Sequence, residues 1–501
     1  MSLATVHSRA KLGIEAPLVS VEVHLSNGLP AFHIVGLPET AVKESKDRVR
    51  SAIINAHFEF PARRITVNLA PAELPKEGAR FDLAIAIGIL AASGQIPTDL
   101  LSKHEFIAEL ALSGELRPVE ALLPSAIACA RAGKGLILSI NNASEAALVE
   151  SLSVLPAAHL LQVSAHMYQR EPLQPWQPTA TQSRKSIPQL NEVIGQDHAK
   201  RALEIAASGN HHLLLYGPPG TGKTMLASRL PGLLPPLSNS EALEVAAIHS
   251  VAGQSDRATQ NINRPFRAPH HSASAAALVG GGSNPKPGEI SLAHCGVLFL
   301  DELPEFQRQV LEMLREPMES GEIMISRVAA QTCYPAGFQL VAAMNPCPCG
   351  YLGAQRCTCT PDQIARYRSK LSGPLMDRID LQVQVSAIEN QQLLDRPALQ
   401  KGETNDIIQR RILGARQTQI ARQGKVNSAL TSDELHQVCP LNKAQRQLMD
   451  RAIKQYALST RGFYRVLKVA RTIADLAGLE QPDTAQYQEA LSYRPAINPL
   501  S

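Results

Sequence analysis

The chain has 501 residues, too many for a single hydrophobic core, so we expect two to four domains. Hydrophobic residues make up 44% of it and charged residues 19%, a balance that excludes a disordered chain. The longest apolar runs, near residues 83–92 and 297–300, are too short to cross a bilayer, and the first residues lack the apolar core of a signal peptide. We therefore expect a cytoplasmic protein with no membrane partner.

Strand and helix patterns divide the chain at residues 169–189, a linker rich in Pro, Gln and Ser that lacks apolar periodicity. Residues 1–168 mix short β-type runs with helical ones and predict an α/β domain. In residues 190–390 strands and helices alternate, which predicts a parallel sheet with helices on both faces. Residues 391–501 are helical in pattern. The predicted fold class is therefore α/β, with a helical C-terminal domain.

The most specific motif follows an apolar strand at residues 213–216 and leads into a helix. Strand, glycine-rich loop and helix together are the context of a phosphate-binding loop, in which glycines let backbone N–H groups face the phosphates. Lys223 is placed to reach the terminal phosphates, and the Thr224 hydroxyl to bind Mg²⁺. We therefore predict ATP and Mg²⁺ as cofactors. The residues expected to line the nucleotide are Gly217, Pro218, Pro219, Gly220, Thr221, Gly222, Lys223 and Thr224.

Two later strands end in polar residues that would complete such a site. The apolar run 297–300 leads into Asp301 and Glu302. Asp301 would join Thr224 at the magnesium ion, and Glu302 would polarise the attacking water. A third strand, at residues 338–344, ends at Asn345, whose amide would help orient that water. Taken alone, an asparagine in this position is more typical of a turn.

Four of the eight cysteines form two Cys-x-Cys pairs, Cys347 with Cys349 and Cys357 with Cys359. Four thiolates around a glycine-containing turn could hold one tetrahedral Zn²⁺ in a structural site. Metal is favoured over disulfides in a reducing cytoplasm. The one-residue spacing is tighter than in common zinc motifs, so free thiols or an oxidisable switch stay open as alternatives.

The motifs at Lys223, Asp301, Asn345 and residues 375–380 occur in the order found in AAA+ ATPases. They resemble Walker A, Walker B, sensor 1 and an arginine finger. Residues 264–306 resemble the magnesium-chelatase-like branch of these proteins, and together with the domains on either side the chain is similar to the ComM/YifB family. The resemblance implies an ATPase that assembles as a homo-hexamer.

Two further arginines gain a role from this resemblance. Arg378 looks like the arginine finger, which would stabilise the charge that develops at the γ-phosphate bound by the neighbouring subunit. A local ion pair with Asp377 or Asp380 is the alternative for Arg378. Arg461 looks like sensor 2, which would contact phosphate from a C-terminal helical lid.

The competence members of the family are taken to be branch-migration helicases in natural transformation. The resemblance therefore implies DNA, single-stranded or branched, as a partner, with a recombinase as a further candidate partner. Residues 321–328 resemble the hairpin before sensor 1 in related helicases, where a basic tip meets DNA. Arg327 is the candidate DNA contact, and an ordinary exposed arginine is the alternative reading. Weaker candidates are Arg267, His270 and His271.

Positive charge is concentrated toward the C-terminus. From residue 403 onward there are 14 Lys and Arg against 9 Asp and Glu. Arg461, Arg465, Lys468 and Arg471 recur every three or four residues and would share one helix face. Such a stripe is either a solvated helix face or a surface for phosphates.

The first domain resembles the proteolytic domain of Lon, through residues 75–78 and 112–119. Aligned on those anchors, the catalytic serine position falls at Arg80 and the catalytic lysine position at Leu123. Neither side chain can perform that chemistry, because a guanidinium is no nucleophile and leucine accepts no proton. Ser113 and Lys76 lie nearby in the sequence but outside the motif positions. We therefore expect the fold without peptidase activity.

Two functional hypotheses follow from these motifs. The first is an ATP-driven hexameric motor on DNA, most specifically a branch-migration helicase. The second is a chelatase-like or MoxR-like ATPase that remodels a protein partner. The nucleotide motifs fit both hypotheses, so stimulation of ATP hydrolysis by DNA would separate them.

Overall fold

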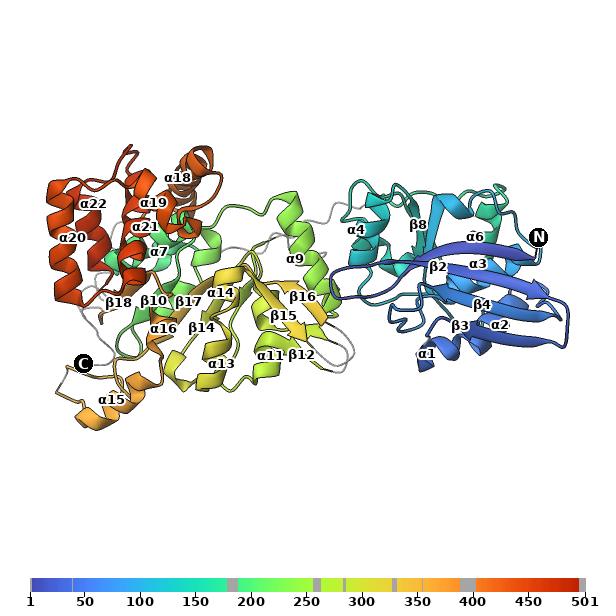
Figure 1. The fold of residues 1–501 in the computed structure, drawn as a ribbon, viewed down its shortest axis with the longest axis horizontal. Coiled ribbons are helices and arrows are strands. Elements are labelled where there is room, and N and C mark those ends of the chain that lie inside the picture. The colour runs from blue at the N-terminus through green and yellow to red at the C-terminus, as the bar shows by residue number, and fades with distance from the viewer. Residues whose placement is uncertain are drawn as a thin grey trace.

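A computed structural model describes residues 2–37, 39–177, 188–255, 263–282, 285–326, 331–353, 355–387 and 402–494. The molecule is elongated, and an N-terminal sheet, a central sheet and a group of C-terminal helices follow one another along its long axis (Figure 1). Within the described residues, no helix combines the length and the apolar character that a membrane span requires.

The N-terminal part is built on a seven-stranded mixed sheet in the order β3-β4-β2-β1-β5-β8-β9. Its apolar residues alternate along the antiparallel strands, so that Val6, Val21 and Leu69 lie side by side on one buried face. Helix α3 (Asp82–Ala92) packs on this face and is buried along its entire length. The strands are β1 (Leu3–Arg9), β2 (Leu18–Ser26), β3 (Ala31–Val35), β4 (Arg64–Ala70), β5 (His104–Ile107), β8 (Gly135–Ser139) and β9 (Val154–Ala157).

The other N-terminal elements cover this sheet and its edges. A small ribbon pairs β6 (Glu109–Leu110) with β7 (Leu116–Arg117). The helices are α1 (Thr40–Lys43), α2 (Ser45–Asn55), α4 (Leu123–Arg131), α5 (Ala143–Ala146) and α6 (Leu160–Met167).

The central sheet has five parallel strands in the order β11-β14-β17-β10-β18. Strands β10 and β14 read as unbroken apolar runs because both faces of the sheet are buried, whereas β18 carries Gln382 and Gln384. One face packs on α7 (Asp197–Gly209) and on the C-terminal helices, and the other face forms a second core with shorter helices. The strands are β10 (Leu213–Tyr216), β11 (Phe266–Arg267), β14 (Val297–Leu300), β17 (Gln339–Met344) and β18 (Leu381–Gln384). This is the parallel sheet that the alternating pattern predicts.

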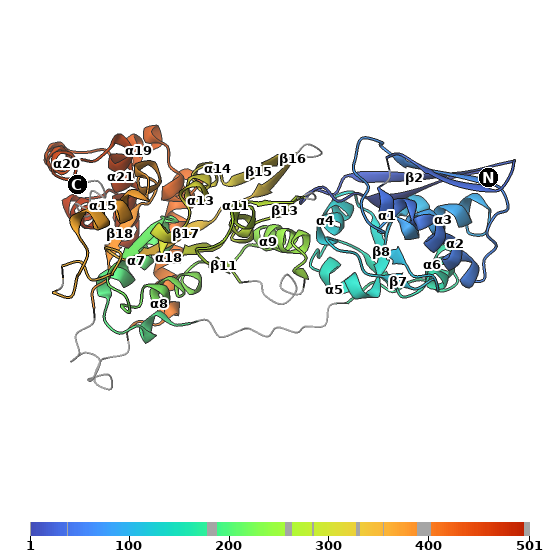
Figure 2. The ribbon, with the colours of Figure 1, turned by 90° about the horizontal axis from the view of Figure 1, so that it is seen from below.

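Short helices and two hairpins surround the central sheet. The helices are α8 (Lys223–Ala227), α9 (Asn239–Val251), α11 (Ala275–Val279), α12 (Glu289–Leu292), α13 (Arg308–Met313), α14 (Pro317–Ser320), α15 (Pro361–Ser369) and α16 (Gly373–Met376). The hairpins pair β12 (Gly280–Gly281) with β13 (Lys286–Pro287), and β15 (Glu322–Ser326) with β16 (Gln331–Pro335). Figures 1 and 2 both place β15 and β16 on the side of the central sheet that faces the N-terminal sheet.

The N-terminal part and the central part meet at several places, which include packing of α4 on α9 and two further contacts. The turn between β1 and β2 meets the second hairpin, where Gly13 lies directly against the Thr332 side chain. In the second contact, Glu145 of α5 accepts a 2.5 Å hydrogen bond from Ser250 of α9. Burial raises the pKa of Glu145, and the hydrogen bonds that it accepts oppose this shift.

The described C-terminal part contains five helices, of which α18 (Asn405–Gln423) and α21 (Thr460–Leu476) pack on α7. Three of them begin with a reciprocal capping box, as at Thr431 with Glu434, which satisfies N–H groups of the first turn. The helices are α18 (Asn405–Gln423), α19 (Ser432–Val438), α20 (Lys443–Tyr456), α21 (Thr460–Leu476) and α22 (Thr484–Ser492).

The basic stripe lies on α21, but it is not an exposed face. Arg465 donates to Asp380 at 2.5 Å, and Lys468 donates to the Ser428 carbonyl at 2.7 Å. Arg471, 1% exposed, is paired with Asp475. Of the four cations, Arg461 alone is exposed. Both interpretations of the stripe, as a solvated face or as a surface for phosphates, are therefore wrong, because Arg465 and Arg471 are paired with carboxylates and Lys468 is hydrogen-bonded inside the fold.

Asp380 is the carboxylate on which the contact between the central sheet and α21 depends. Its burial would raise its pKa, but Arg465 and the neighbouring His211 and His212 hold that pKa well below its ordinary value. We expect Arg465→Met to lower the free energy of unfolding by about 3 kcal/mol at neutral pH, because it leaves a buried carboxylate without its main cation. Urea unfolding followed by circular dichroism measures this loss.

The matched control is Lys454→Met, since Lys454 and Asp450 form an ion pair whose side chains are 74% and 62% exposed. That change should lower the free energy of unfolding by about 1 kcal/mol or less. The pKa of Asp380 is depressed in the folded state, so its stabilising contribution is complete above the unfolded pKa of about 4 and disappears as pH falls below it. The gap between wild type and Arg465→Met should therefore narrow in acid, and a gap independent of pH would contradict this origin.

Candidate nucleotide site and cysteine cluster

The glycine-rich loop joins the end of β10 to the start of α8. Gly217 must be glycine for steric reasons, since a Cβ there would lie 2.1 Å from the Val385 carbonyl oxygen of the neighbouring strand. Gly220 and Gly222 have φ of +78° and +86°, the left-handed region that glycine enters without strain. The loop therefore has the backbone that a phosphate cradle needs.

Lys223 lies inside this loop and connects it to sensor 1. Its Nζ donates to the carbonyl oxygens of Gly217 and Pro218, each at 2.8 Å, and to Asn345 Oδ1 at 3.2 Å. Burial lowers the pKa of Lys223, and the nearby Asp301 carboxylate opposes that shift. The lysine predicted to bind phosphate and the asparagine predicted to orient water thus lie together.

The proposed magnesium ligands are also adjacent. Thr224 Oγ1 donates to Asp301 Oδ2 at 2.7 Å, and the other carboxylate oxygen accepts from the Glu302 backbone N–H at 2.9 Å. A hydroxyl and a carboxylate at one point are oxygen ligands of the kind that Mg²⁺ prefers. The residues present therefore fit a magnesium ion bound together with a nucleotide.

Glu302 has a partner that sequence reasoning did not assign to it. Its backbone is left-handed, with φ of +51°, and its side chain lies 3.2 Å from His271 Nδ1. His271 follows β11, which pairs in parallel with β14, the strand that leads into Glu302. The rule that parallel strands end at one edge of a sheet could have indicated this contact. His271, a weak candidate for DNA contact, thus lies beside the predicted catalytic carboxylate, and Arg267 is paired with Glu289 at 2.6 Å.

Arg378 and Arg461 lie apart from this cluster. Arg378 is 4% exposed, makes an ion pair of 2.5 Å with Glu319 and donates to the Pro374 carbonyl at 2.8 Å. Burial lowers its pKa, Glu319 opposes this, and Arg461 is close enough to lower the pKa further. The two arginines are thus near each other. Neither forms a hydrogen bond or ion pair with residues 217–224 in the described part of the chain.

Arg327, the candidate DNA contact, lies outside the described residues. The hairpin that carries it is described up to Ser326 and from Gln331 onward, and these two residues pair with each other. The expected hairpin before sensor 1 is therefore present, and the role of its tip stays a prediction.

The four clustered cysteines converge on one point. The Sγ atom of Cys347 lies 3.4 Å from that of Cys349 and 3.9 Å from that of Cys357, and Cys349 and Cys357 are 3.6 Å apart. All four sulfurs, including Cys359, lie within 4.8 Å of one another. A Zn²⁺ with bonds of about 2.3 Å to four sulfurs has tetrahedral edges of about 3.8 Å. The cluster therefore fits a tetrahedral metal ion despite its tight sequence spacing.

Backbone hydrogen bonds prepare one of these thiols for a metal. The N–H groups of Tyr351 and Thr358 lower the pKa of Cys349 to about 6. A thiolate is the form of cysteine that binds metal. Cys347 is fully buried, whereas Cys349 and Cys359 line an open depression beside α15.

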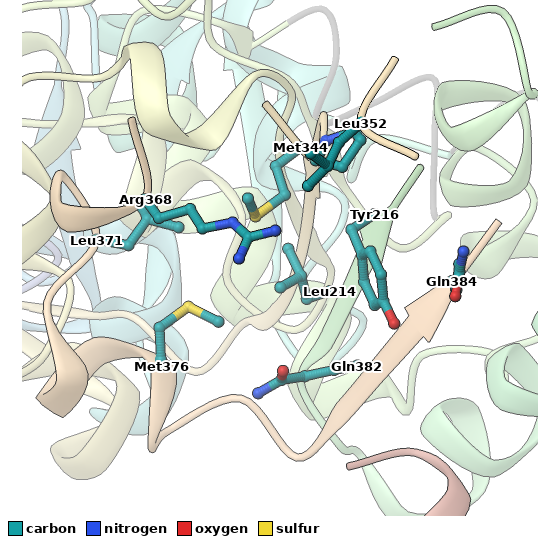
Figure 3. Close-up of a pocket in the computed structure, with 10 residues that line it drawn as sticks. Leu214, Tyr216, Met344, Leu352, Arg368, Leu371, Met376, Gln382 and Gln384 are labelled. Atoms are coloured by element: carbon teal, nitrogen blue, oxygen red, sulfur yellow. The ribbon is translucent and has the colours of Figure 1, made fainter. Parts of the chain in front are cut away.

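A separate cavity of about 210 Å³ lies beneath α15 and against the central sheet (Figure 3). Leu214, Tyr216 and Met344 form its sheet side, and the Arg368 guanidinium points into it. Leu352 closes it from the segment that carries the cysteines. The cavity does not include the phosphate loop, but Tyr216 and Met344 immediately precede Gly217 and Asn345.

The N-terminal part places the two altered Lon positions next to each other. Arg80 is 4% exposed and donates to the carbonyl oxygens of Glu120 and Ala121 at 2.8 and 3.3 Å and to Ser125 Oγ at 3.4 Å. Leu123, within the same segment, is fully buried. Burial lowers the pKa of Arg80 to about 10. A guanidinium thus fills the place that the Lon resemblance assigns to the nucleophile.

Three family models match the chain. They are described as "Magnesium chelatase, subunit ChlI" over residues 189–393, "Subunit ChlI of Mg-chelatase" over residues 21–142, and "Magnesium chelatase, subunit ChlI C-terminal" over residues 402–494. The "Competence protein ComM" of Haemophilus influenzae is 51% identical over 513 residues, which cover 100% of this chain and 99% of that protein. YifB of Escherichia coli is 50% identical over 494 residues, which cover 99% and 97% of the two chains.

A shorter match links the chain to Lon. An archaeal Lon protease of Archaeoglobus fulgidus is 52% identical over 46 residues, which are 9% of this chain and 7% of that protein.

Together with the parallel sheet and its phosphate loop, the family-model matches define a magnesium-chelatase-like AAA+ protein, a class of ATPases that use ATP and Mg²⁺. The chain belongs to the ComM/YifB family.

The geometry at Glu302 predicts that nucleotide binding and hydrolysis can be separated. Glu302→Gln should leave ATP binding close to wild type and slow hydrolysis by about 10²-fold or more, because the general base is lost and the phosphate loop is intact. Lys223→Ala should instead abolish binding. Binding of a fluorescent ATP analogue and release of phosphate measure the two steps. Glu305→Gln, at a carboxylate paired with Lys370, is the control, and an equal loss of hydrolysis there would contradict the assignment.

Proposed function

We propose that this protein is an ATP-hydrolysing hexameric AAA+ motor that acts on DNA, a branch-migration helicase in recombination during natural transformation. The observation that carries the proposal is the division of the catalytic groups between two places. Lys223, Thr224, Asp301 and Glu302 form one cluster, and Arg378 lies elsewhere with Arg461. Such a site is complete only when a second copy brings its Arg378 to the nucleotide.

Each group has a defined role in this proposal. Lys223 binds the terminal phosphates, while Thr224 and Asp301 hold Mg²⁺, which would neutralise charge on the phosphates when bound. Glu302 accepts the proton of the attacking water, which Asn345 helps to orient. Arg378 stabilises charge at the γ-phosphate of the neighbouring subunit, and Arg461 contacts phosphate from the C-terminal helical lid. Arg378 must leave its ion pair with Glu319 to do so.

Support for DNA as the substrate comes from two sources. The Haemophilus influenzae relative is named a competence protein. The hairpin β15–β16 precedes the strand of Asn345, which is the place that related helicases give to a DNA-contacting hairpin. Arg327 is the proposed contact, and binding through it should weaken as salt concentration rises. A cytoplasmic location and a recombinase partner belong to the same proposal.

The alternative is an ATPase that remodels a protein, as a chelatase-like or MoxR-like protein would. The descriptions of the three family models support it. The two proposals share every residue of the nucleotide site. They differ in whether DNA changes the rate of hydrolysis.

We expect single-stranded or four-way-junction DNA to stimulate ATP hydrolysis, because a DNA motor couples hydrolysis to its movement along DNA. The stimulation should fade with added salt and vanish in Lys223→Ala. Arg327→Ala should reduce the stimulation and leave basal hydrolysis unchanged. A labelled junction then tests branch migration. Hydrolysis that is indifferent to every DNA tested would favour the protein-remodelling alternative.

Mixing two inactive variants tests whether Arg378 acts on the neighbouring subunit. Arg378→Ala should lose about 10³-fold or more of the hydrolysis rate, and Lys223→Ala should be inactive. In a random mixture about a quarter of the interfaces combine an intact Lys223 with an intact Arg378 from the next subunit. Activity should therefore return on mixing, as measured by phosphate release. No recovery in a mixture that assembles would contradict action between subunits.

A further inference from the structure

The segment that carries the four cysteines starts at sensor 1 and returns to the phosphate loop. We call residues 345–353 and 355–359 the cysteine loop. Its turn at Gly350 has φ of +85°, and a Cβ there would lie 2.7 Å from Pro219 Cδ and 3.7 Å from Asn345 Cγ. The backbone of the cysteine loop is thus in direct contact with the phosphate loop at Pro219.

A second set of contacts reaches the catalytic lysine. Asn345, the first residue of the cysteine loop, accepts the hydrogen bond from Lys223 Nζ through its side chain. Its backbone N–H binds the hydroxyl oxygen of Tyr367 in α15. Cys347, two residues further on, is fully buried. The cysteine loop and the helix that follows it therefore contribute contacts both to the phosphate loop and to the catalytic lysine.

The four cysteines lie in two pairs, one in the first part of the cysteine loop and one at its end. Cys347 and Cys349 precede the Gly350 turn, and Cys357 and Cys359 lie just before Thr360, the N-cap of α15. The Gly350 N–H donates to the Cys347 carbonyl at 3.0 Å, and the Cys349 N–H donates to Cys359 Sγ at 3.4 Å. A metal ion bound to the four sulfurs would cross-link the two ends, and its binding free energy would stabilise the conformation that touches Pro219.

We propose that the cysteine loop is a metal-dependent support for the phosphate loop, so that loss of the metal weakens nucleotide binding. Gly350 is the positioning residue at the contact. The inference rests on the proposed nucleotide site but concerns its regulation. The class of ligand is a divalent ion that accepts four thiolates in a tetrahedron, Zn²⁺ or Fe²⁺.

Two glycines of the loop offer a matched pair of variants. Gly350 and Gly353 share a φ of +85°, so an alanine at either position bears the same backbone strain. A Cβ at Gly350 meets Pro219, whereas a Cβ at Gly353 meets nothing within 4 Å. We expect Gly350→Ala to weaken binding of a fluorescent ATP analogue about tenfold, a shift that a steric cost of this kind produces. Gly353→Ala should change it less than about twofold.

Metal content is measured on both variants. Each should retain about one Zn²⁺ or Fe²⁺ per chain, which shows that the loop has kept its fold. Weak nucleotide binding in Gly350→Ala with the metal retained supports the contact. Equal affinities in the two variants would overturn it.

Removing the metal tests the support as a whole. The full-length protein is treated with a thiol-seeking chelator, and nucleotide binding is then measured in excess Mg²⁺ so that the phosphate-bound ion is not limiting. Affinity should fall about tenfold and return when Zn²⁺ is restored. Cys357→Ser should reproduce the loss, and Cys333→Ser, at an exposed cysteine outside the cluster, should not.

The outcomes separate this inference from the proposed function. If the metal-free protein binds nucleotide as tightly as the loaded protein, the support is refuted and the nucleotide site stands. A purified protein that takes up no metal would also overturn the inference. If neither form binds nucleotide, the proposed ATPase itself fails.

Discussion

Strand β10 is flanked by β17 and β18, with β14 beyond β17, and all four run parallel. Their register aligns Tyr216 with Met344 and Leu300 with Ala342, so the residues that follow each strand emerge at the same edge of the sheet. The meeting of Lys223 with Asn345, and of Thr224 with Asp301, depends on this alignment. A shift of one strand by a single residue would reverse which side chains face each core and separate these groups.

Ion pairs also form next to that sheet, at the start of β18. Asp380 stands at the start of β18 and receives Arg465 from α21, so one buried ion pair fixes the C-terminal helices to the edge of the sheet. Arg378, three residues before β18, forms an ion pair with Glu319. The proposed release of Arg378 from Glu319 would occur close to the contact that positions the C-terminal helices, so we expect it to be coupled to movement of those helices.

The sequence predicts well those parts of the structure that are determined by residues close together in the sequence. The phosphate loop needs glycines at fixed spacing, and apolar runs that end in Asp301 and Asn345 identify buried parallel strands whose ends meet. The basic stripe on α21 misleads because Asp380, the partner of Arg465, lies 85 residues away in the sequence. The same holds for His271 with Glu302 and for Arg378 with Glu319. Helical spacing shows which charges share a face, but tertiary packing decides whether that face meets solvent.

The packing of Arg80 limits which residues the N-terminal domain can accept at positions 80 and 123. Its guanidinium satisfies the carbonyl oxygens of Glu120 and Ala121, and Leu123 beside it is fully buried. A serine at residue 80 would leave those carbonyls without a donor and open a void, while a lysine at residue 123 would bury a charge. Each of these substitutions alone is therefore expected to cost stability, so the packing around Arg80 and Leu123 disfavours the residue pair that peptidase chemistry would need.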